Sequence, residues 1–245
     1  MESSAPSFLT AEWRYLAMLN YEIDPVILSP FLPKGTELDQ WQEKTFASVV
    51  GFLFLKTRIK GVSIPFHSDF EEVNLRFYVR RSGPEGWRRG VVFIKELVPR
   101  RAIAWVARTF YNENYLAVPM GHEKWEETGG LKQKIAYTWT FQGRKNCLEL
   151  FTQGEAVETP ENSHEEFIIE HYWGYARQRD GGTAEYRVEH PRWRVWSAGE
   201  ARLDCDVAAL YGPSFVSALS QPPYSAFLAD GSAITVFGGV RLPSA

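Results

Sequence analysis

Residues 68–81 (SDFEEVNLRFYVRR) carry the feature that most constrains the fold, a strand-like alternation of apolar and polar side chains. Successive side chains of a β-strand point to opposite faces, so this segment has two distinct faces. The apolar face consists of Val73, Leu75, Phe77 and Val79. The polar face consists of Glu72, Asn74, Arg76 and Tyr78, spaced at roughly 6.6–6.8 Å along the strand. The apolar face is suited to a core, and the polar face suits either solvent or the lining of a cavity.

Most of the remaining chain is predicted to form strands joined by tight turns. A Gly-Pro-Glu-Gly turn at residues 83–86 joins residues 68–81 to a returning strand at 90–98. Glycine-containing turns at 180–182 and 230–231 indicate two further hairpins. The predicted strands cover residues 12–23, 45–56, 68–81, 90–98, 134–141, 147–156, 172–179, 183–190, 225–228 and 233–237.

Short helices are predicted between these strands. They cover residues 25–31, 102–109, 164–170 and 205–211. Asp24, Ser163 and Asp204 are the predicted N-caps of three of them, and Ser163 with Glu166 fits a capping box. Antiparallel neighbours joined by turns, with so few helices, predict a mainly β (α+β) fold built on one closed or strongly curled sheet.

Two other strands have predicted faces. In residues 12–23, one face carries Trp13, Tyr15, Ala17, Leu19 and Tyr21. In residues 90–98, Lys95 shares a face with Val91, Phe93 and Leu97. Apolar surroundings lower the pKa of a lysine and can make it a nucleophile toward carbonyl compounds. The same lysine can instead extend its ammonium group to water, so both interpretations stay open.

Length and composition predict one domain over residues 1–245, with its core at about residues 8–242. With 44% hydrophobic and 15% aromatic residues, the chain can bury a large core. The formal net charge of −3 argues against nucleic acid as a partner, because nucleic acid requires a basic face. Arginine pairs beside the predicted strands are interpreted as solvated charges. They are Arg80–Arg81, Arg88–Arg89 and Arg100–Arg101.

Nothing in the sequence predicts a membrane segment, a metal or a cofactor. It has neither a run of about 18 apolar residues nor a basic start followed by an apolar run, so we expect no membrane contact and a cytoplasmic location. Cys147 and Cys205 lack metal or redox spacing and are expected to be free thiols. His164 and His171 lie seven residues apart among glutamates, which we interpret as an ordinary charged helix face.

The polar face of residues 68–81 is the best candidate for chemistry. If it lines a cavity, Arg76 can hold an anionic group and Glu72 can exchange a proton with a ligand. The same two side chains can instead form a salt-bridged ladder or meet bulk water.

Several motifs along the chain resemble one family. They are Trp-x-x-Leu-x-x-Leu-Asn-Tyr at 13–21, Asp24-Pro25 with Leu32-Pro33-x-Gly35, Glu-x-Asn-x-Arg-x-Tyr at 72–78, Ala107-Arg108, Glu-Phe-x-x-Glu-x-Tyr at 166–172 and Val-x-His-Pro-x-Trp at 188–193. On these motifs the chain is identified as a member of the YqjF-like family of uncharacterised proteins (domain of unknown function 2071). That family resembles acetoacetate decarboxylase in fold, which implies a β-rich body curled into a cone or barrel around a buried site.

The resemblance also implies which residues form that site. An aromatic-x-Glu element supplies an active-site glutamate in the decarboxylase, and the similar Phe70-Glu71-Glu72 points to Glu72. Counting from Arg108 places Tyr115 where the decarboxylase has its Schiff-base lysine, and a phenol cannot form that imine. The predicted catalytic residues are therefore Glu72 and Tyr115. The predicted substrate-binding residues are Asn74, Arg76, Tyr78 and Arg108.

The leading hypothesis is a cytoplasmic protein that binds a small organic molecule, anionic or carbonyl-containing, without a cofactor. Glu72 would move protons, Arg76 or Arg108 would hold the anion, and Tyr115 would donate a hydrogen bond. One alternative is a Schiff-base enzyme that uses Lys95. Another is a non-catalytic module that docks a protein through Trp125, Trp173, Trp193 and Trp196. Homo-oligomerisation stays open.

Overall fold

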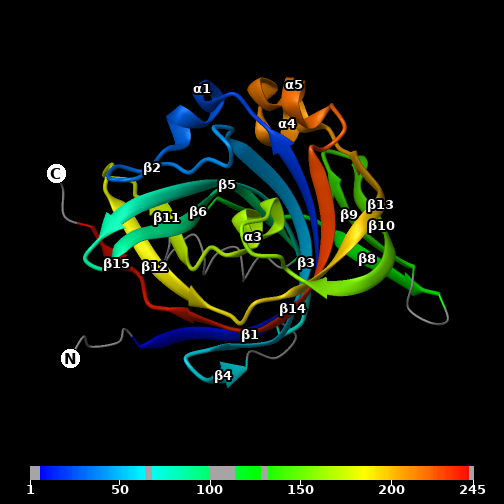
Figure 1. The fold of residues 1–245 in the computed structure, drawn as a ribbon, viewed down its shortest axis with the longest axis horizontal. Coiled ribbons are helices and arrows are strands. Elements are labelled where there is room, and N and C mark those ends of the chain that lie inside the picture. Colours follow the sequence, from blue (N-terminus) through cyan, green and yellow to red (C-terminus); the bar gives the residue numbers. More distant parts are fainter. Residues whose placement is uncertain (1–5, 64–67, 100–113, 128–131, 243–245) are drawn as a thin grey trace.

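The computed structural model describes residues 6–63, 68–99, 114–127 and 132–242 (Figure 1). In these ranges the strands are β1 (Ser7–Glu22), β2 (Glu37–Leu38), β3 (Phe46–Ile59), β4 (Val62–Ser63), β5 (Phe70–Gly83), β6 (Gly86–Val98), β7 (Tyr115–Ala117), β8 (Met120–Glu126), β9 (Gln133–Phe141), β10 (Arg144–Glu158), β11 (Trp173–Arg177), β12 (Thr183–Glu189), β13 (Arg194–Asp204), β14 (Ser225–Phe237) and β15 (Val240–Arg241). The helices are α1 (Pro25–Leu28), α3 (His164–Ile169), α4 (Val207–Tyr211) and α5 (Val216–Leu219), with 3-10 turns η1 (Ser29–Phe31) and η2 (Pro213–Phe215). The helix predicted at 102–109 lies outside the described residues.

The described strands form one curled sheet. Its order is β15-β12-β11-β6-β5-β3-β1-β14-β13-β10-β9-β8, and β12 also pairs with β14. The pairing therefore returns on itself through β12, β11, β6, β5, β3, β1 and β14, while β13, β10, β9 and β8 extend the sheet beyond this ring. Pairing is antiparallel except where β11 and β7 run parallel to β6. The predicted mainly β fold with a curled sheet and short helices is confirmed.

Figure 1 places α3 inside the curl and α1, α4 and α5 outside it. The two faces of the ring consequently belong to two different cores. Outside the ring, side chains of β1, β3, β5 and β6 pack against aromatic and aliphatic side chains of β9 and β10. The predicted apolar face of β5 is part of this outer core, where Val73, Leu75, Phe77 and Val79 are each 0% exposed. The polar face of β5 therefore points to the inside of the ring.

Inside the ring, a second core forms around α3. Phe167, Ile168 and Ile169 of this helix pack with Met18 and Val50, which belong to β1 and β3. The predicted N-cap Ser163 accepts a hydrogen bond from the backbone N–H of Glu166 at 3.1 Å. The first turn of α3 begins where the capping motif predicts, which fixes the chain entry into the interior.

A β-bulge removes Trp13 from the predicted face of β1. Trp13 pairs with Phe54 and Ala17 pairs with Gly51, so β1 has one residue more than β3 between these pairs. Tyr15, in the bulge, has φ 55°. Because an extra residue reverses the alternation, Trp13 points to the inside of the ring while Ala17 joins the outer core. The predicted shared face is therefore wrong for Trp13, whereas Tyr15, Ala17, Leu19 and Tyr21 all belong to the outer core as predicted.

The prediction of a C-terminal hairpin at residues 225–237 is also wrong, because these residues form the single strand β14, which pairs with β1. Gly231 has φ 77°, and a Cβ there would overlap the carbonyl oxygen of Trp13. The glycine thus permits a close approach between two strands rather than a turn. The N-cap of α4 is Asp206 rather than the predicted Asp204, because β13 extends through Asp204.

Candidate functional site

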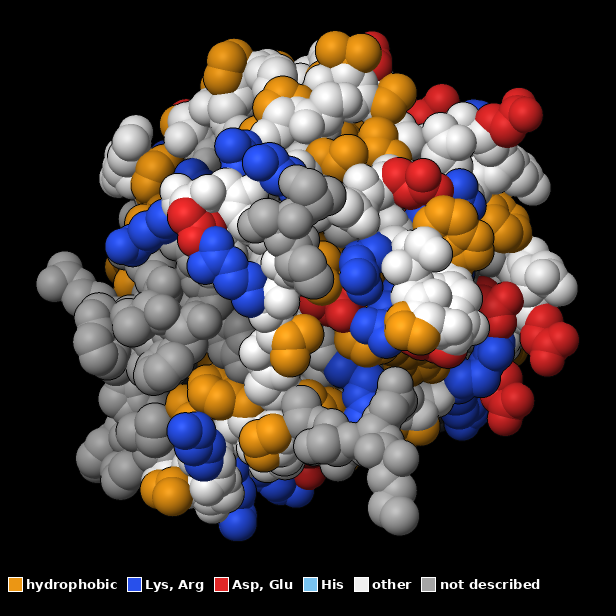
Figure 2. All heavy atoms as spheres, turned by 90° about the vertical axis from the view of Figure 1, so that its left-hand side faces the viewer, with side chains coloured by type: hydrophobic (Ala, Val, Ile, Leu, Met, Phe, Trp, Pro, Cys, Tyr) orange, Lys and Arg blue, Asp and Glu red, His pale blue; other side chains and the backbone are white. Residues whose placement is uncertain are grey.

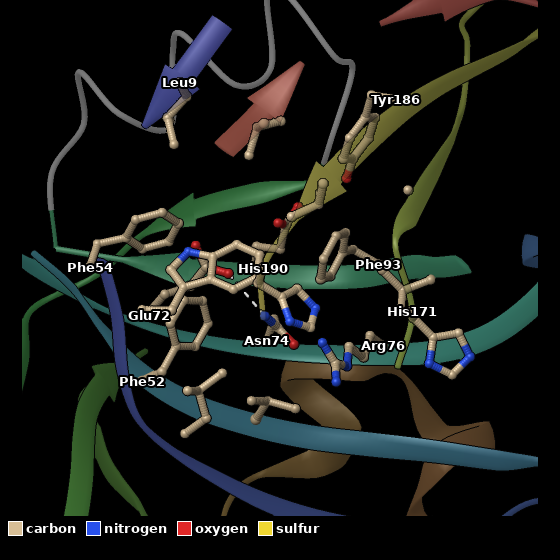
Figure 3. Close-up of a pocket in the computed structure, with 18 of the residues that line it drawn as sticks. Leu9, Phe52, Phe54, Glu72, Asn74, Arg76, Phe93, His171, Tyr186 and His190 are labelled. Carbon is tan, nitrogen blue, oxygen red and sulfur yellow. Dashed lines mark hydrogen bonds between the residues drawn. The ribbon is translucent and has the colours of Figure 1, made fainter. Parts of the chain in front are cut away.

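A cavity of about 190 Å³ lies inside the ring (Figure 3). Its wall is mostly aromatic and aliphatic, with contributions from β1, β3, β5, β6, β11, β12 and α3. Apart from tryptophans, the polar side chains that line it are Thr57, Glu72, Asn74, Arg76, Glu96, Tyr115, His171, Tyr186 and His190. Glu72, Asn74 and Arg76 follow one another along β5, as the two-residue period requires. The structure thus places this part of the predicted polar face in a cavity.

Glu72, the acid of this row, is buried, with 2% of its surface exposed. One carboxylate oxygen accepts a hydrogen bond from Asn74 Nδ2 at 2.9 Å, and the other from the Tyr115 hydroxyl at 3.2 Å. Burial raises the pKa of Glu72 to about 7, although these hydrogen bonds and the charge of Arg76 oppose the change. Glu72 can therefore both hold and release a proton near neutral pH.

Tyr115 reaches Glu72 from β7, which runs parallel to β6 beside Glu96. Burial and the neighbouring carboxylates of Glu72 and Glu96 raise the pKa of Tyr115 well above its usual value. The phenol consequently stays protonated and acts as a hydrogen-bond donor. Glu96 pairs with Asn74 across the β5–β6 ladder and is 2% exposed, so two buried carboxylates share this end of the cavity.

Arg76 occupies the other end of the polar row. Its Nη2 donates to the carbonyl oxygen of Ile168 at 3.3 Å, and its guanidinium lies 5.6 Å from the Tyr78 ring centroid. Its buried Nε has no hydrogen-bond partner, and no carboxylate forms an ion pair with Arg76 among the described residues. A guanidinium with unused donors in a cavity is suited to bind a ligand's carboxylate.

His171 lies beyond Arg76, directly after α3, and its ring is 4.7 Å from that of Tyr78. Burial lowers the pKa of His171 to about 4, so the ring is neutral at pH 7. Its Nε2 is 3.8 Å from Asp39 Oδ2, too far for a hydrogen bond. Burial opposes ionisation of Asp39, yet His171 and Arg89 together hold the pKa of Asp39 at about 2. The sequence placed His171 just past the end of the predicted helix and did not indicate its position at the cavity.

Two of the predicted substrate-binding residues, Tyr78 and Arg108, are not among the described residues that line the cavity. The Tyr78 hydroxyl is hydrogen-bonded to Ser48 Oγ at 2.6 Å. The Tyr78 ring is 1% exposed and packs beneath Arg76, which favours a supporting position over ligand contact. Arg108 lies outside the described residues.

A second bulge overturns the predicted face of Lys95. Leu75 pairs with Lys95 and Arg76 pairs with Phe93, which leaves Ile94 as an extra residue in β6. Phe93 lines the cavity, whereas Lys95 lies on the outer side and donates to the Leu210 carbonyl oxygen at 2.6 Å. The prediction that Lys95 and Phe93 share a face is wrong, since the bulge reverses the alternation.

This placement removes the amine needed for Schiff-base chemistry in the cavity. No lysine is among the described residues that line the cavity. The ranges outside the described residues contain no lysine in their sequence. The imine-forming alternative with Lys95 thus gains no support from the geometry.

The four tryptophans considered as docking anchors are not alike. Trp125 is 54% exposed, whereas Trp193 is 4% exposed and lines the cavity together with Trp173. Trp196 packs against the outer core. Because three of the four take part in internal packing, this set does not form a docking surface.

The arginines at the β5–β6 turn are paired rather than simply solvated. Arg81 and Arg88 both bind Glu185, with N–O distances of 3.0 and 2.6 Å, and Glu185 is 2% exposed. Arg89 binds Asp39 at 2.6 Å. On the visible part of the face in Figure 2, basic side chains are interspersed with acidic and hydrophobic ones. The interpretation of these three arginines as solvated charges is wrong.

The cavity contains further residues that the sequence did not indicate. Tyr186 approaches Gly174 so closely that a Cβ on the glycine would overlap its ring. His190 is stacked on Trp193, with ring centroids 4.3 Å apart. The motif at residues 188–193 contained His190 and Trp193, but neither was assigned to the site.

Within the described ranges, no helix is long and apolar enough to cross a membrane, and no group of three or more His, Cys, Asp or Glu side chains could hold a metal ion.

Solved structures with a similar fold agree with this architecture. The enduracididine biosynthesis enzyme MppR complexed with pyruvate has a TM-score of 0.68 at 13% identity, covering 99% of this chain and 92% of that chain. The acetoacetate decarboxylase from Legionella pneumophila has a TM-score of 0.66 at 12% identity, covering 98% of this chain and 90% of that chain. The acetoacetate decarboxylase-like fold implied by the motifs is confirmed.

Sequence comparison gives the family. The uncharacterized protein YqjF of Bacillus subtilis (strain 168) is 28% identical over 113 residues, which are 46% of this chain. The match spans 45% of the length of that curated relative. The model of a family described as uncharacterized conserved protein, DUF2071, matches residues 10–233. Since that match covers most of the sequence, the chain belongs to the DUF2071 family.

Proposed function

We propose that the cavity inside the ring binds a small organic acid or carbonyl compound, and that Glu72 exchanges a proton with it. One observation carries this proposal: a group that can bind an anion and a group that can exchange a proton lie on the same face of β5. Arg76 offers unused guanidinium donors, and Glu72 has a pKa raised to about 7 by burial. A cavity that combines charge recognition with a neutral-range proton carrier is typical of acid/base chemistry.

Arg76 is the residue proposed to hold the anionic group. In the described part of the chain, its guanidinium contacts a backbone carbonyl and an aromatic ring but no carboxylate. An incoming carboxylate can therefore accept two hydrogen bonds without displacing an existing ion pair. The mostly apolar wall reduces screening of this charge pair by water.

Glu72 and Tyr115 are the proposed acid/base pair. In its ionised form Glu72 can accept a proton from the ligand, and in its neutral form it can return that proton. Tyr115 donates a hydrogen bond to Glu72 and stays protonated, so it holds the carboxyl group in place, and a ligand oxygen that takes over this hydrogen bond would compete with Glu72 and Glu96 for it. This chemistry requires no lysine.

The structural neighbours support the choice of ligand class. MppR is described as complexed with pyruvate, a small 2-oxo acid, although only its fold is shared at 13% identity. We therefore propose carboxylic and 2-oxo acids as the first ligands to test. The cytoplasmic location and the lack of nucleic-acid binding stay predictions.

Isothermal titration calorimetry with a panel of carboxylic and 2-oxo acids at pH 7 tests the proposal. We expect at least one acid to bind the parent protein, and Arg76→Met to weaken this binding by about tenfold to a hundredfold through loss of a charge-assisted hydrogen-bonding partner.

Arg80→Met is the matched control, since Arg80 lies on the same strand but binds Glu37 at the surface at 2.6 Å. It should bind the acid like the parent. No binding by the parent, or equal binding by Arg76→Met, would show that the cavity is not an anion site.

A further inference from the structure

Asn74 lies between Glu72 and Arg76 in the polar row, and the NH₂ group of its side-chain amide is already hydrogen-bonded. Its Nδ2 donates to Glu72 Oε1 at 2.9 Å, which orients Oδ1 away from that carboxylate. The side chain lines the cavity and is 2% exposed. Asn74 Oδ1 has no hydrogen-bond partner among the described residues. The wall of the cavity therefore contains a buried acceptor without a hydrogen-bond partner.

This acceptor lies one step along β5 from an unused donor. Asn74 and Arg76 are two residues apart on the same face, and Arg76 Nε is likewise without a hydrogen-bond partner in the described part of the chain. Figure 3 shows both side chains on the cavity side of β5. A ligand that satisfies both residues must accept at Arg76 and donate at Asn74.

This pair of requirements separates classes of organic acid. A carboxylate or a 2-oxo group can only accept hydrogen bonds, so it satisfies Arg76 and leaves Asn74 Oδ1 buried without a donor. A hydroxyl close to the acid group supplies the missing donor. Leaving a buried acceptor unsatisfied has a substantial free-energy cost, which a hydroxy acid avoids.

The aromatic wall beside Glu72 suggests what the rest of the ligand contains. Trp13 makes edge contacts with Phe52 and Phe54, with centroid distances of 5.6 and 5.9 Å. Phe54 is stacked on Phe70 at 4.8 Å, and all four residues line the cavity. Such a wall favours a flat apolar group.

We propose that the ligand is a hydroxy acid with an apolar, aryl-sized body, whose carboxylate binds Arg76 and whose hydroxyl donates to Asn74 Oδ1. This inference rests on the proposed function and narrows its ligand class. It assigns Asn74 as the residue that discriminates hydroxy acids from oxo acids and plain acids of equal size.

The test uses three acids that differ at one carbon: 3-phenylpropanoate, 3-phenyllactate and 3-phenylpyruvate. Calorimetry on the parent should show that phenyllactate binds about tenfold more tightly than either other acid. In Asn74→Leu, which lacks the amide oxygen, the three affinities should become equal within about twofold. Because the ratio is measured within one protein, a partly folded variant preparation leaves it unchanged.

The outcomes separate this inference from the proposed function. Equal binding of the three acids by the parent, or a preference that survives in Asn74→Leu, overturns the hydroxy-acid assignment while leaving an acid-binding cavity in place. Tighter binding of phenylalanine than of phenyllactate also overturns it, in favour of an amine donor. Failure of all three phenyl acids to bind, while another acid of the panel binds, overturns only the hydroxy-acid assignment. Failure of every acid in the panel overturns both proposals.

Discussion

The two ends of the cavity differ in how they treat charge. At one end, the buried carboxylates of Glu72 and Glu96 lie close to the phenol of Tyr115, and burial raises the pKa of Glu72, which favours its neutral form. At the other end, Arg76 offers a guanidinium beside His171, whose pKa burial lowers to about 4. One end is therefore suited to exchange a proton, and the other to hold a fixed negative charge.

This difference shows how one strand can provide two functions. Glu72, Asn74 and Arg76 share a face of β5 only because the two-residue period runs through them without interruption. Asn74 contacts Glu72 directly and separates it from Arg76 along the strand. The acid and the guanidinium consequently do not neutralise each other, and each stays available to a ligand.

Removing the acid should have the largest effect on stability. The folded-state pKa of Glu72, about 7, lies above its ordinary value, so its favourable contribution is complete below about pH 4.5 and is lost as pH rises through 7. Glu72→Gln has no such loss. Its unfolding free energy relative to the parent should therefore rise by ~2–3 kcal/mol between pH 5 and pH 8 in urea denaturation.

The matched control for this prediction is Glu71→Gln on the same strand. Glu71 points away from the cavity and contacts His122 at 2.8 Å near the surface. The unfolding free energy of Glu71→Gln relative to the parent should change far less over the same pH range. An unchanging difference between Glu72→Gln and the parent would mean that Glu72 does not bind a proton near neutrality.

Removing the buried imidazole should have a smaller effect with the opposite pH trend. The folded-state pKa of His171, about 4, lies below its ordinary value, so its contribution is present above about pH 6.5 and is lost as pH falls toward 4. Arg76 and Arg89 disfavour its protonation, and Asp39 favours it.

In His171→Gln, the stability deficit relative to the parent should shrink by ~1–2 kcal/mol from pH 7 to pH 5, again measured by urea denaturation. The control is His122→Gln, because His122 lies near the surface. If the His171→Gln deficit is the same at both pH values, the imidazole does not resist protonation in the folded protein.

Removing the outer lysine should have the smallest effect on the site. Lys95 Nζ donates to the Leu210 carbonyl outside the cavity, so Lys95→Met should bind acids within about twofold of the parent. Borohydride treatment of the parent with pyruvate, followed by mass spectrometry, should leave Lys95 unmodified. An adduct on Lys95 would restore the Schiff-base alternative.

The sequence predicted the half of the site whose strand is regular. The alternation in β5 placed Glu72, Asn74 and Arg76 on a shared face, and the family motifs indicated that this face points inward. Tyr115 came from the resemblance alone, because a single tyrosine in a short strand has no pattern of its own. The structure brings it within hydrogen-bonding distance of Glu72.

The sequence did not predict the other half of the site, because the positions of those residues depend on β-bulges and on long-range packing. The extra residue at Ile94 turns Glu96 into the cavity and Lys95 out of it, yet no glycine or proline marks that position. The bulge at Tyr15 likewise turns Trp13 inward. His171 follows a helix whose capping box was correctly predicted, but its contact with the cavity depends on where the curled sheet places α3.

The central claim is that a bound anion at Arg76 and the proton on Glu72 are linked within one cavity. Calorimetric titration of a binding acid at pH 7.5, in two buffers with different ionisation enthalpies, measures that link directly. An added negative charge should raise the pKa of Glu72 further, so binding should take up a fraction of a proton in the parent and in Glu71→Gln but not in Glu72→Gln. Binding without proton uptake by the parent, or with equal uptake by Glu72→Gln, would contradict the account.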